Sequence, residues 1–103
     1  MWSHGSFYWN ELMTRDAEKA KAFYSSAIGW SFDAMPMENG TYWVAKMAGQ
    51  PVGGIFSMNG PDFAGVPEHW MPYLAVDEID RRIGAAKAAG AKVIREPFDV
   101  PSV

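Results

Sequence analysis

The spacing of apolar residues changes within the first thirty positions of the chain. Bulky aromatic residues begin Ser6–Thr14, and side chains there alternate with the two-residue period of a strand. From Ala17 the apolar residues recur every three or four positions, as on one face of a helix. Asp16 is a suitable N-cap for that helix, and Gly29 is a suitable residue to end it. This part of the chain therefore predicts a strand followed by a helix.

Three strands are predicted next, over Trp30–Met35, Thr41–Met47 and Val52–Met58. Pro36 is expected to end the first of them, and Asn39–Gly40 is a strong turn dipeptide before the second. Gly53 and Gly54 interrupt the third. We expect this pair to mark a bulge, a strained backbone or a close approach of a neighbouring segment.

A linker rich in glycine and proline, Asn59–Glu68, separates this first unit from a second. A strand is predicted over Trp70–Val76, followed by a helix that begins near Asp77–Asp80 and ends at Gly90. A further strand is predicted at Lys92–Arg95. The order strand, helix, strand thus begins again.

The two units share landmarks at one spacing of 61 residues, which indicates an internal repeat. The matching pairs mark strand starts, helix caps and strand ends: Trp9 with Trp70, Asp16 with Asp77, Gly29 with Gly90, and Pro36 with Pro97. The predicted fold is α+β, with paired βαβββ modules in one domain over residues 1–103. The first module covers about residues 6–58, the linker 59–68, and an incomplete second module 69–103. A ferredoxin-like dimeric barrel is the alternative fold, but its βαββαβ order has no place for the extra strand before Met58.

Composition limits the classes of partner. The 103 residues include nine basic and twelve acidic residues, so a role in nucleic-acid or anionic-membrane binding has little electrostatic support. Cysteine is absent, which excludes disulfides and thiolate chemistry. No apolar run reaches the length of a spanning helix and no signal peptide is visible, so a cytoplasmic location is expected.

Several phrases of the sequence resemble the vicinal oxygen chelate superfamily, which includes glyoxalase I, bleomycin-resistance proteins, fosfomycin-resistance enzymes and extradiol dioxygenases. They are similar to its glyoxalase-like branch in particular. The phrases are Trp9–Asp16 (WNELMTRD), Ala22–Tyr24 with Ile28–Trp30, Gly53–Ile55, and Tyr73–Asp77. The resemblance implies a curved sheet from each βαβββ module, with a small ligand held in the cavity between paired sheets.

The resemblance also implies positions for metal ligands, and this chain departs from them. The first-strand position falls on Trp9, the fifth-strand position on Met71, and the fourth-strand position near Gly53 or Gly54. None of these residues ligates a hard divalent ion. We therefore expect no metal and no other cofactor, and the departure argues against an enzyme.

Glu11 is the candidate catalytic residue, because a carboxylate on the strand face with Trp9 and Met13 could act as a general acid or base. A structural role, bonded to an arginine or to backbone amides, is the other interpretation. His4 and His69 could join Glu11 in a metal set in principle. His4 lies near the chain start and His69 at the end of the linker, so exposed or hydrogen-bonded histidines are expected instead.

Aromatic residues are abundant enough to line a cavity for a flat or cationic small molecule, or else to form an ordinary core and a surface covered by a partner subunit. They are Trp9, Tyr42, Trp43, Phe56, Trp70 and Tyr73. The expected function is small-molecule binding of the bleomycin-resistance type without a metal. The candidate ligand-binding residues are Trp9, Glu11, Met13, Trp43, Gly54, Met71 and Tyr73. Two alternatives stay open: a divergent lyase or oxidoreductase that uses Glu11 for acid–base chemistry, and a non-catalytic, truncated structural fragment.

A homodimer is also expected. An unfinished second module would expose strand edges and an apolar sheet face, both of which a second copy could cover. Light scattering coupled to size exclusion should then report about twice the mass of one 11.4 kDa chain. A single-chain mass at the highest soluble concentration would contradict this prediction.

Overall fold

The computed structural model describes residues 3–38 and 40–99. The chain divides into two compact units. The larger unit is Phe7–Tyr73, and the smaller unit joins the N-terminal residues up to Ser6 with the residues from Leu74 onward.

The larger unit begins with strand β1 (Phe7–Thr14) and helix α1 (Ala17–Ile28), as the sequence predicts. The Asp16 side chain caps α1 by accepting a hydrogen bond of 3.0 Å from the Lys19 backbone N–H. Gly29 ends the helix in the left-handed conformation, with φ of 80°, which glycine adopts without steric cost. Both helix ends therefore follow from local sequence.

Three strands come next: β2 (Ser31–Met37), β3 (Gly40–Met47) and β4 (Gln50–Ser57). The prediction that Pro36 ends the first strand is wrong, because Pro36 lies inside β2 and pairs with Thr41. β2 is at the edge of the sheet, where a residue without an N–H is tolerated. Asn39 of the predicted turn lies outside the described residues.

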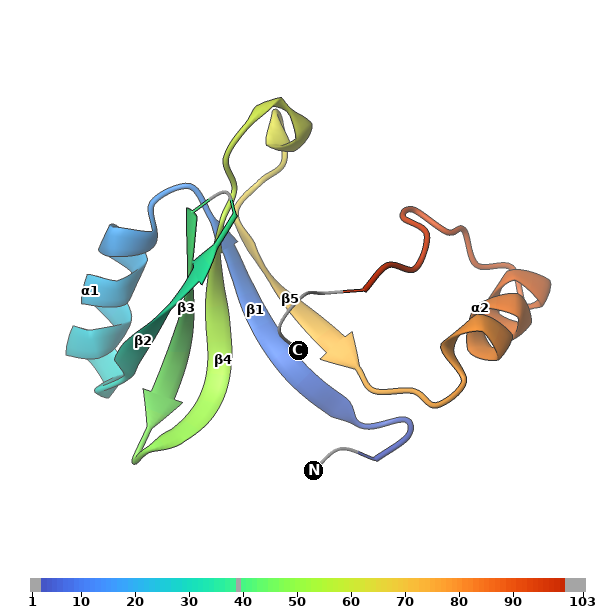
Figure 1. Ribbon diagram of the computed structural model, residues 1–103, viewed down its shortest axis with the longest axis horizontal. Coiled ribbons are helices and arrows are strands. Elements are labelled where there is room, and N and C mark those ends of the chain that lie inside the picture. The colour runs from blue at the N-terminus through green and yellow to red at the C-terminus, as the bar shows by residue number, and fades with distance from the viewer. Residues whose placement is uncertain (1–2, 39, 100–103) are drawn as a thin grey trace. The chain divides into compact units, whose positions relative to one another are not determined.

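The strands form one mixed sheet in the order β2-β3-β4-β1-β5, where β5 is His69–Leu74 (Figure 1). β1 runs parallel to β4, with Glu11 opposite Gly54, whereas β2, β3 and β4 are antiparallel neighbours. A register shift interrupts β3 and β4 between Ala45 and Lys46. Helix α1 connects β1 to β2 and contacts β4 from one face of the sheet.

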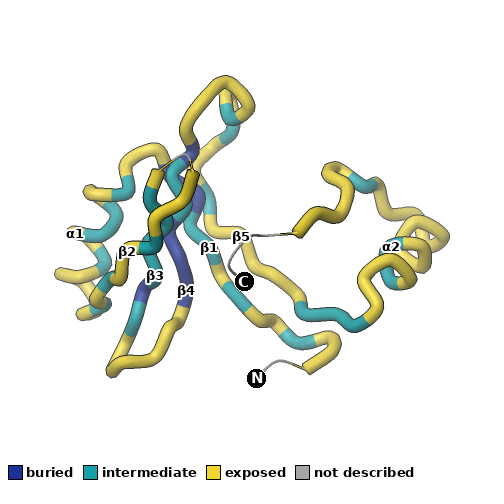
Figure 2. Tube along the Cα trace, viewed as in Figure 1, coloured by how far each residue is buried: buried dark blue, intermediate teal, exposed yellow. Residues whose placement is uncertain are grey.

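A small core forms around the middle of β4 (Figure 2). The buried apolar side chains are Met13, Ala45, Ile55 and Met58. Ile55 is 0% exposed, and it is the one large side chain of the described residues that is completely buried. Its cross-strand partners are Leu12 and Trp43. Packing of the sheet against α1 is therefore centred on Ile55.

An aromatic cluster joins α1 to the same face of the sheet. Tyr24 of α1 stacks on Trp30, at 5.1 Å between ring centroids, and meets Trp70 of β5 edge-on. The Trp70 indole Nε1 donates a hydrogen bond of 3.1 Å to the Tyr24 hydroxyl. Phe32 of β2 meets the Trp30 ring edge-on, at 6.5 Å between ring centroids. These ring contacts link α1 to β2 and β5.

The smaller unit contains helix α2 (Ile79–Ala88). The expectation that Asp77 caps this helix is wrong: Glu78 is the N-cap, in a left-handed conformation with φ of 45°, and makes no capping side-chain bond. Asp77 instead accepts hydrogen bonds from the guanidinium of Arg82 at 2.9 and 3.0 Å. These bonds lower the pKa of Asp77 below its usual range.

The strand predicted at Lys92–Arg95 is absent from the described residues, which have no regular structure there. A strand needs a neighbour to share its hydrogen bonds. Among the described residues, the smaller unit holds only Leu74 in strand conformation. The end of the predicted second module, residues 100–103, lies outside the described residues.

The observed order is β-α-β-β-β followed by a second strand and helix, β5 and α2. The chain is thus an α+β protein with one βαβββ module and an incomplete second one, and not a ferredoxin-like barrel. Over residues 3–38 and 40–99, no helix is long and apolar enough to cross a membrane.

Candidate functional site

The sheet has a second face, opposite α1, that presents Glu11. On β1, side-chain alternation places Trp9, Glu11 and Met13 on this face and Asn10 and Leu12 on the other. Contacts agree with this alternation, because Leu12 is opposite the core residue Ile55 whereas Glu11 meets tyrosines described below. We call this surface the Glu11 face.

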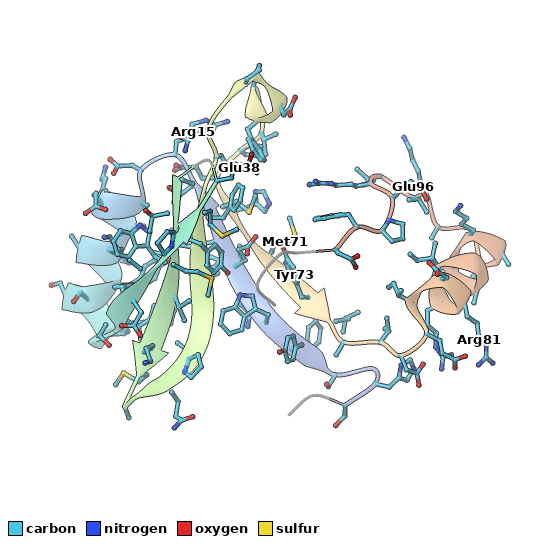
Figure 3. All side chains as sticks on the ribbon, viewed as in Figure 1. Arg15, Glu38, Met71, Tyr73, Arg81 and Glu96 are labelled. Carbon is cyan, nitrogen blue, oxygen red and sulfur yellow. The ribbon has the colours of Figure 1, made fainter. Side chains whose placement is uncertain are left out.

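Glu11 accepts a hydrogen bond of 3.0 Å from the hydroxyl of Tyr73 on β5. Met71 precedes Tyr73 by two positions on β5 and therefore shares its face, and Figure 3 labels both side chains. Both are partly exposed, Met71 at 36% and Tyr73 at 39%. A half-buried carboxylate therefore lies beside accessible apolar and aromatic side chains.

Tyr42 of β3 reaches the same carboxylate from the other direction. Its hydroxyl accepts a hydrogen bond of 2.8 Å from the Trp9 indole Nε1. Burial raises the pKa of Tyr42, and the nearby Glu11 carboxylate raises it further through its charge and a hydrogen bond. The Trp9 hydrogen bond acts in the opposite direction but does not outweigh burial. Tyr42 therefore keeps its hydroxyl proton, and this O–H can donate a hydrogen bond to the Glu11 carboxylate.

The reach of Tyr42 depends on the absence of a side chain at Gly54. A Cβ built on Gly54 would coincide with the Tyr42 hydroxyl and lie 2.7 Å from the ring carbon Cε2. A Cβ built on Gly53 would lie 2.8 Å from the backbone carbonyl oxygen of Asn10. Neither glycine has a positive φ. The expectation of a close approach at this pair is thus confirmed, and the cause is crowding by neighbours and not an unusual backbone conformation.

The structure does not bring Trp43 to the Glu11 face. Trp43 is opposite Ile55 across the sheet, and the Lys21 ammonium of α1 lies 3.0 Å from the centroid of its ring. The side chain therefore packs under the helix, in a cation–π contact. Tyr42, the preceding residue, takes the place that the sequence assigned to Trp43. The sequence of β3 alone does not show which of its two faces meets Glu11, because Tyr42 and Trp43 are both aromatic.

One end of the Glu11 face is bounded by the segment that follows β4. Phe56 is opposite Met13, which is 7% exposed, and its ring contacts Phe63 at 5.6 Å between centroids. Phe63 belongs to a short 3-10 helix, η1 (Pro61–Phe63). The predicted linker therefore folds back onto the sheet through Phe63.

Glu68 ties this segment to the end of β1. Its carboxylate Oε2 accepts hydrogen bonds of 2.7 Å from the Thr14 hydroxyl and from the Arg15 backbone N–H. The Arg15 guanidinium, labelled in Figure 3, donates a further bond of 2.7 Å to the carbonyl oxygen of Phe63. The Arg15 backbone N–H, followed by the Thr14 hydroxyl, lowers the pKa of Glu68. The segment is therefore held in place by charge-assisted bonds.

We expect Glu68→Gln to destabilise the protein at neutral pH and to have little effect in acid. A lowered pKa stabilises the folded state above the unfolded-state value, close to 4.5, and this contribution is lost as the pH falls through the folded-state pKa. Urea unfolding of the wild type and of Glu68→Gln should give different free energies of unfolding at pH about 7 and nearly equal ones at pH about 3. Glu96→Gln, which changes an exposed carboxylate, is the control and should differ little at either pH. A constant difference across this range would contradict the prediction.

The histidines and Glu11 are not assembled into a metal site. His4 accepts a hydrogen bond of 3.0 Å from the Asp77 backbone N–H, and His69 Nδ1 lies 2.7 Å from the carbonyl oxygen of Pro67. Within the described ranges, no group of three His, Asp or Glu side chains could hold a metal ion.

The residues at the positions where the superfamily has its metal ligands do not fit a metal either. At the corresponding positions, the Trp9 indole N–H is engaged as a donor, Met71 offers a soft thioether, and Gly54 has no side chain. No step of a mechanism is therefore assigned to a metal.

The arrangement can serve as a recognition site for a small molecule. A carboxylate can accept hydrogen bonds or hold a positive charge, and the rings of Trp9, Tyr42 and Tyr73 offer flat apolar surface. The predicted members Trp9, Glu11, Met13, Gly54, Met71 and Tyr73 all lie on the Glu11 face, by contact or by strand alternation. Whether they bind a ligand stays a prediction.

Comparison with known proteins agrees with this fold. Residues 6–42 match the family described as bleomycin resistance protein-like N-terminal. Two curated relatives, the provisionally assigned "glyoxylase CFP32" of Mycobacterium bovis (strain ATCC BAA-935 / AF2122/97) and that of Mycobacterium tuberculosis (strain CDC 1551 / Oshkosh), are each 42% identical over 100 residues. The match covers 96% of this chain but 37% of each relative. This chain therefore spans little more than a third of the length of those proteins.

Proposed function

Because the chain belongs to the glyoxalase/bleomycin-resistance (vicinal oxygen chelate) superfamily, we propose that it binds a small organic molecule on the Glu11 face without a metal. The observation that carries this proposal is the Glu11 carboxylate, which accepts a hydrogen bond from Tyr73 beside the half-buried phenol of Tyr42. Fixed polar groups on an apolar, aromatic surface are typical of small-molecule sites. In this proposal the rings supply contact area and Glu11 orients the ligand.

The hydrogen-bond network supports a site that is formed before the ligand arrives. Trp9 holds the Tyr42 hydroxyl, and Tyr73 holds the Glu11 carboxylate. Side chains that are already ordered lose less conformational entropy when a ligand binds. By contrast, Asn10 on the opposite face is exposed and has no such network in the described chain.

An enzymatic role for Glu11 is the alternative. The hydrogen bond of 3.0 Å between Tyr73 and Glu11 would allow a proton to move between a phenol and a carboxylate during a reaction on a bound substrate. In that case Glu11→Gln would abolish turnover while leaving the affinity for a neutral substrate nearly unchanged. The binding proposal predicts no turnover of the bound molecule by the wild-type chain.

We expect Tyr73→Ala to weaken binding of planar aromatic dyes about tenfold, because it removes both ring contact and the hydrogen bond to Glu11. Quenching of tryptophan fluorescence by acridine and by 10-methylacridinium measures this affinity, since Trp9 lies within the site. Tyr8→Ala is the matched control: Tyr8 is exposed, lies on β1, and faces away from Glu11 by alternation. Saturable binding by neither dye, or equal losses in the two variants, would refute the proposed site.

A further inference from the structure

We propose that the ligand of the Glu11 face is an organic cation, a planar molecule that carries one positive charge. This inference rests on the proposed function and adds the sign of the ligand's charge. It depends on how the charges of the Glu11 face are paired.

A row of residues crosses the sheet at the level of Glu11. Glu11 is opposite Gly54, Gly54 is opposite Val44, and Val44 is opposite Asp33. Directly paired residues project to the same face of a sheet. The row therefore carries two carboxylates, at Glu11 and at Asp33, with no side chain at Gly54 between them.

The two carboxylates of this row differ in their partners. Asp33 is neutralised by Lys46, whose ammonium Nζ lies 2.9 Å from Oδ2. Within its own unit, Glu11 has hydroxyl partners only: among the described residues of the larger unit, no lysine, arginine or histidine forms an ion pair with it. Phenol hydroxyls stabilise a carboxylate but leave its negative charge in place. Within the larger unit, Glu11 thus presents a charge that no ion pair neutralises.

The surroundings of this charge favour an organic cation over a neutral or anionic ligand. Trp9, Tyr42 and Tyr73 present aromatic rings around Glu11, and aromatic faces attract cations. A charge at a half-buried site is screened less than one in water, so its attraction for an opposite charge is stronger. A metal ion is the less suitable cation, because the described residues offer no second and third ligand there.

The test compares two dyes of nearly the same shape. Acridine is neutral at pH about 8, whereas 10-methylacridinium always carries one positive charge. With the wild-type chain, the cation is expected to bind at least tenfold tighter than acridine. In Glu11→Gln this preference should disappear, while the affinity for acridine stays within twofold. Thermal unfolding of each variant verifies that it is folded.

One further variant separates the two carboxylates of the row. Asp33→Asn removes a carboxylate that Lys46 already neutralises, so the preference for the cation should not decrease. If the wild-type chain binds both dyes equally, or if Asp33→Asn abolishes the preference as Glu11→Gln does, the cation inference is wrong while the proposed site stands. If neither dye binds saturably, the proposed function itself is wrong.

Discussion

Replacing Gly54 with alanine is expected to destabilise the protein by about 3 kcal/mol, at the upper end of the usual cost of overpacking. The added Cβ would coincide with the Tyr42 hydroxyl, so the Tyr42 ring must leave its place on the Glu11 face. Its hydrogen bond with Trp9 would then be lost, together with its contact with Glu11. Urea unfolding measures the change in the free energy of unfolding, and dye titration of the folded fraction should show weaker binding.

Two comparisons test whether the Tyr42 ring causes the loss of stability in Gly54→Ala. In a Tyr42→Ala background, Gly54→Ala should lower the free energy of unfolding by less than about 1 kcal/mol, because the ring that the new Cβ would meet is absent. The effects of the two substitutions are then strongly non-additive. Gly84→Ala, in α2, adds a Cβ with no atom within 4 Å, and should be neutral or slightly stabilising. A full penalty for Gly54→Ala in the absence of the Tyr42 ring would show that the crowding has another source.

Truncating Ile55 to alanine is expected to cost about 4 kcal/mol, within the range for buried aliphatic side chains. Ile55 is 0% exposed and lies between Leu12 and Trp43, so its removal leaves a cavity between the sheet and α1. Small domains are stable by only about 5–15 kcal/mol, so this substitution removes a large part of the total. Denaturant titration followed by tryptophan fluorescence gives the measurement.

Ile94→Ala is the matched control for this substitution. Ile94 has the same side chain but is 93% exposed, and its truncation should change the free energy of unfolding by less than about 0.5 kcal/mol. Ile55→Val, which removes one methyl group, should cost about 1 kcal/mol. Similar effects at positions 55 and 94 would show that the core is not centred on Ile55.

The elements of the larger unit were predictable because their signals are local. The cap of α1 depends on a contact between Asp16 and Lys19, three residues apart, and its end depends on the backbone freedom of Gly29. The alternation of side chains along β1 is also a local pattern, and it places Glu11 and Leu12 on opposite faces of the sheet. At Pro36 the local signal was misleading, because an edge strand tolerates proline and the sequence does not show which strands are at an edge.

Predictions for the second module, residues 69–103, were less accurate. Asp77 occupies the repeat position of the cap Asp16, yet its carboxylate binds Arg82 instead of the helix N-terminus. Lys92–Arg95 has the composition of a strand but no strand beside it in the described part of its unit. Composition and spacing show that a segment is able to form a strand. Whether it does form one depends on a neighbouring strand with which it can pair.

The sequence by itself determined the βαβββ order, the resemblance to glyoxalase and bleomycin-resistance proteins, and the shared face of Trp9, Glu11 and Met13. Each of these depends on short stretches of neighbouring residues. Only the tertiary structure decided that Tyr42, and not Trp43, joins Glu11. These neighbours point to opposite faces of β3, and the register of β3 against β4 and of β4 against β1 selects between them. The pairing of Glu11 with Gly54 joins strands that are distant in the sequence, and Gly54 leaves room there for the Tyr42 ring.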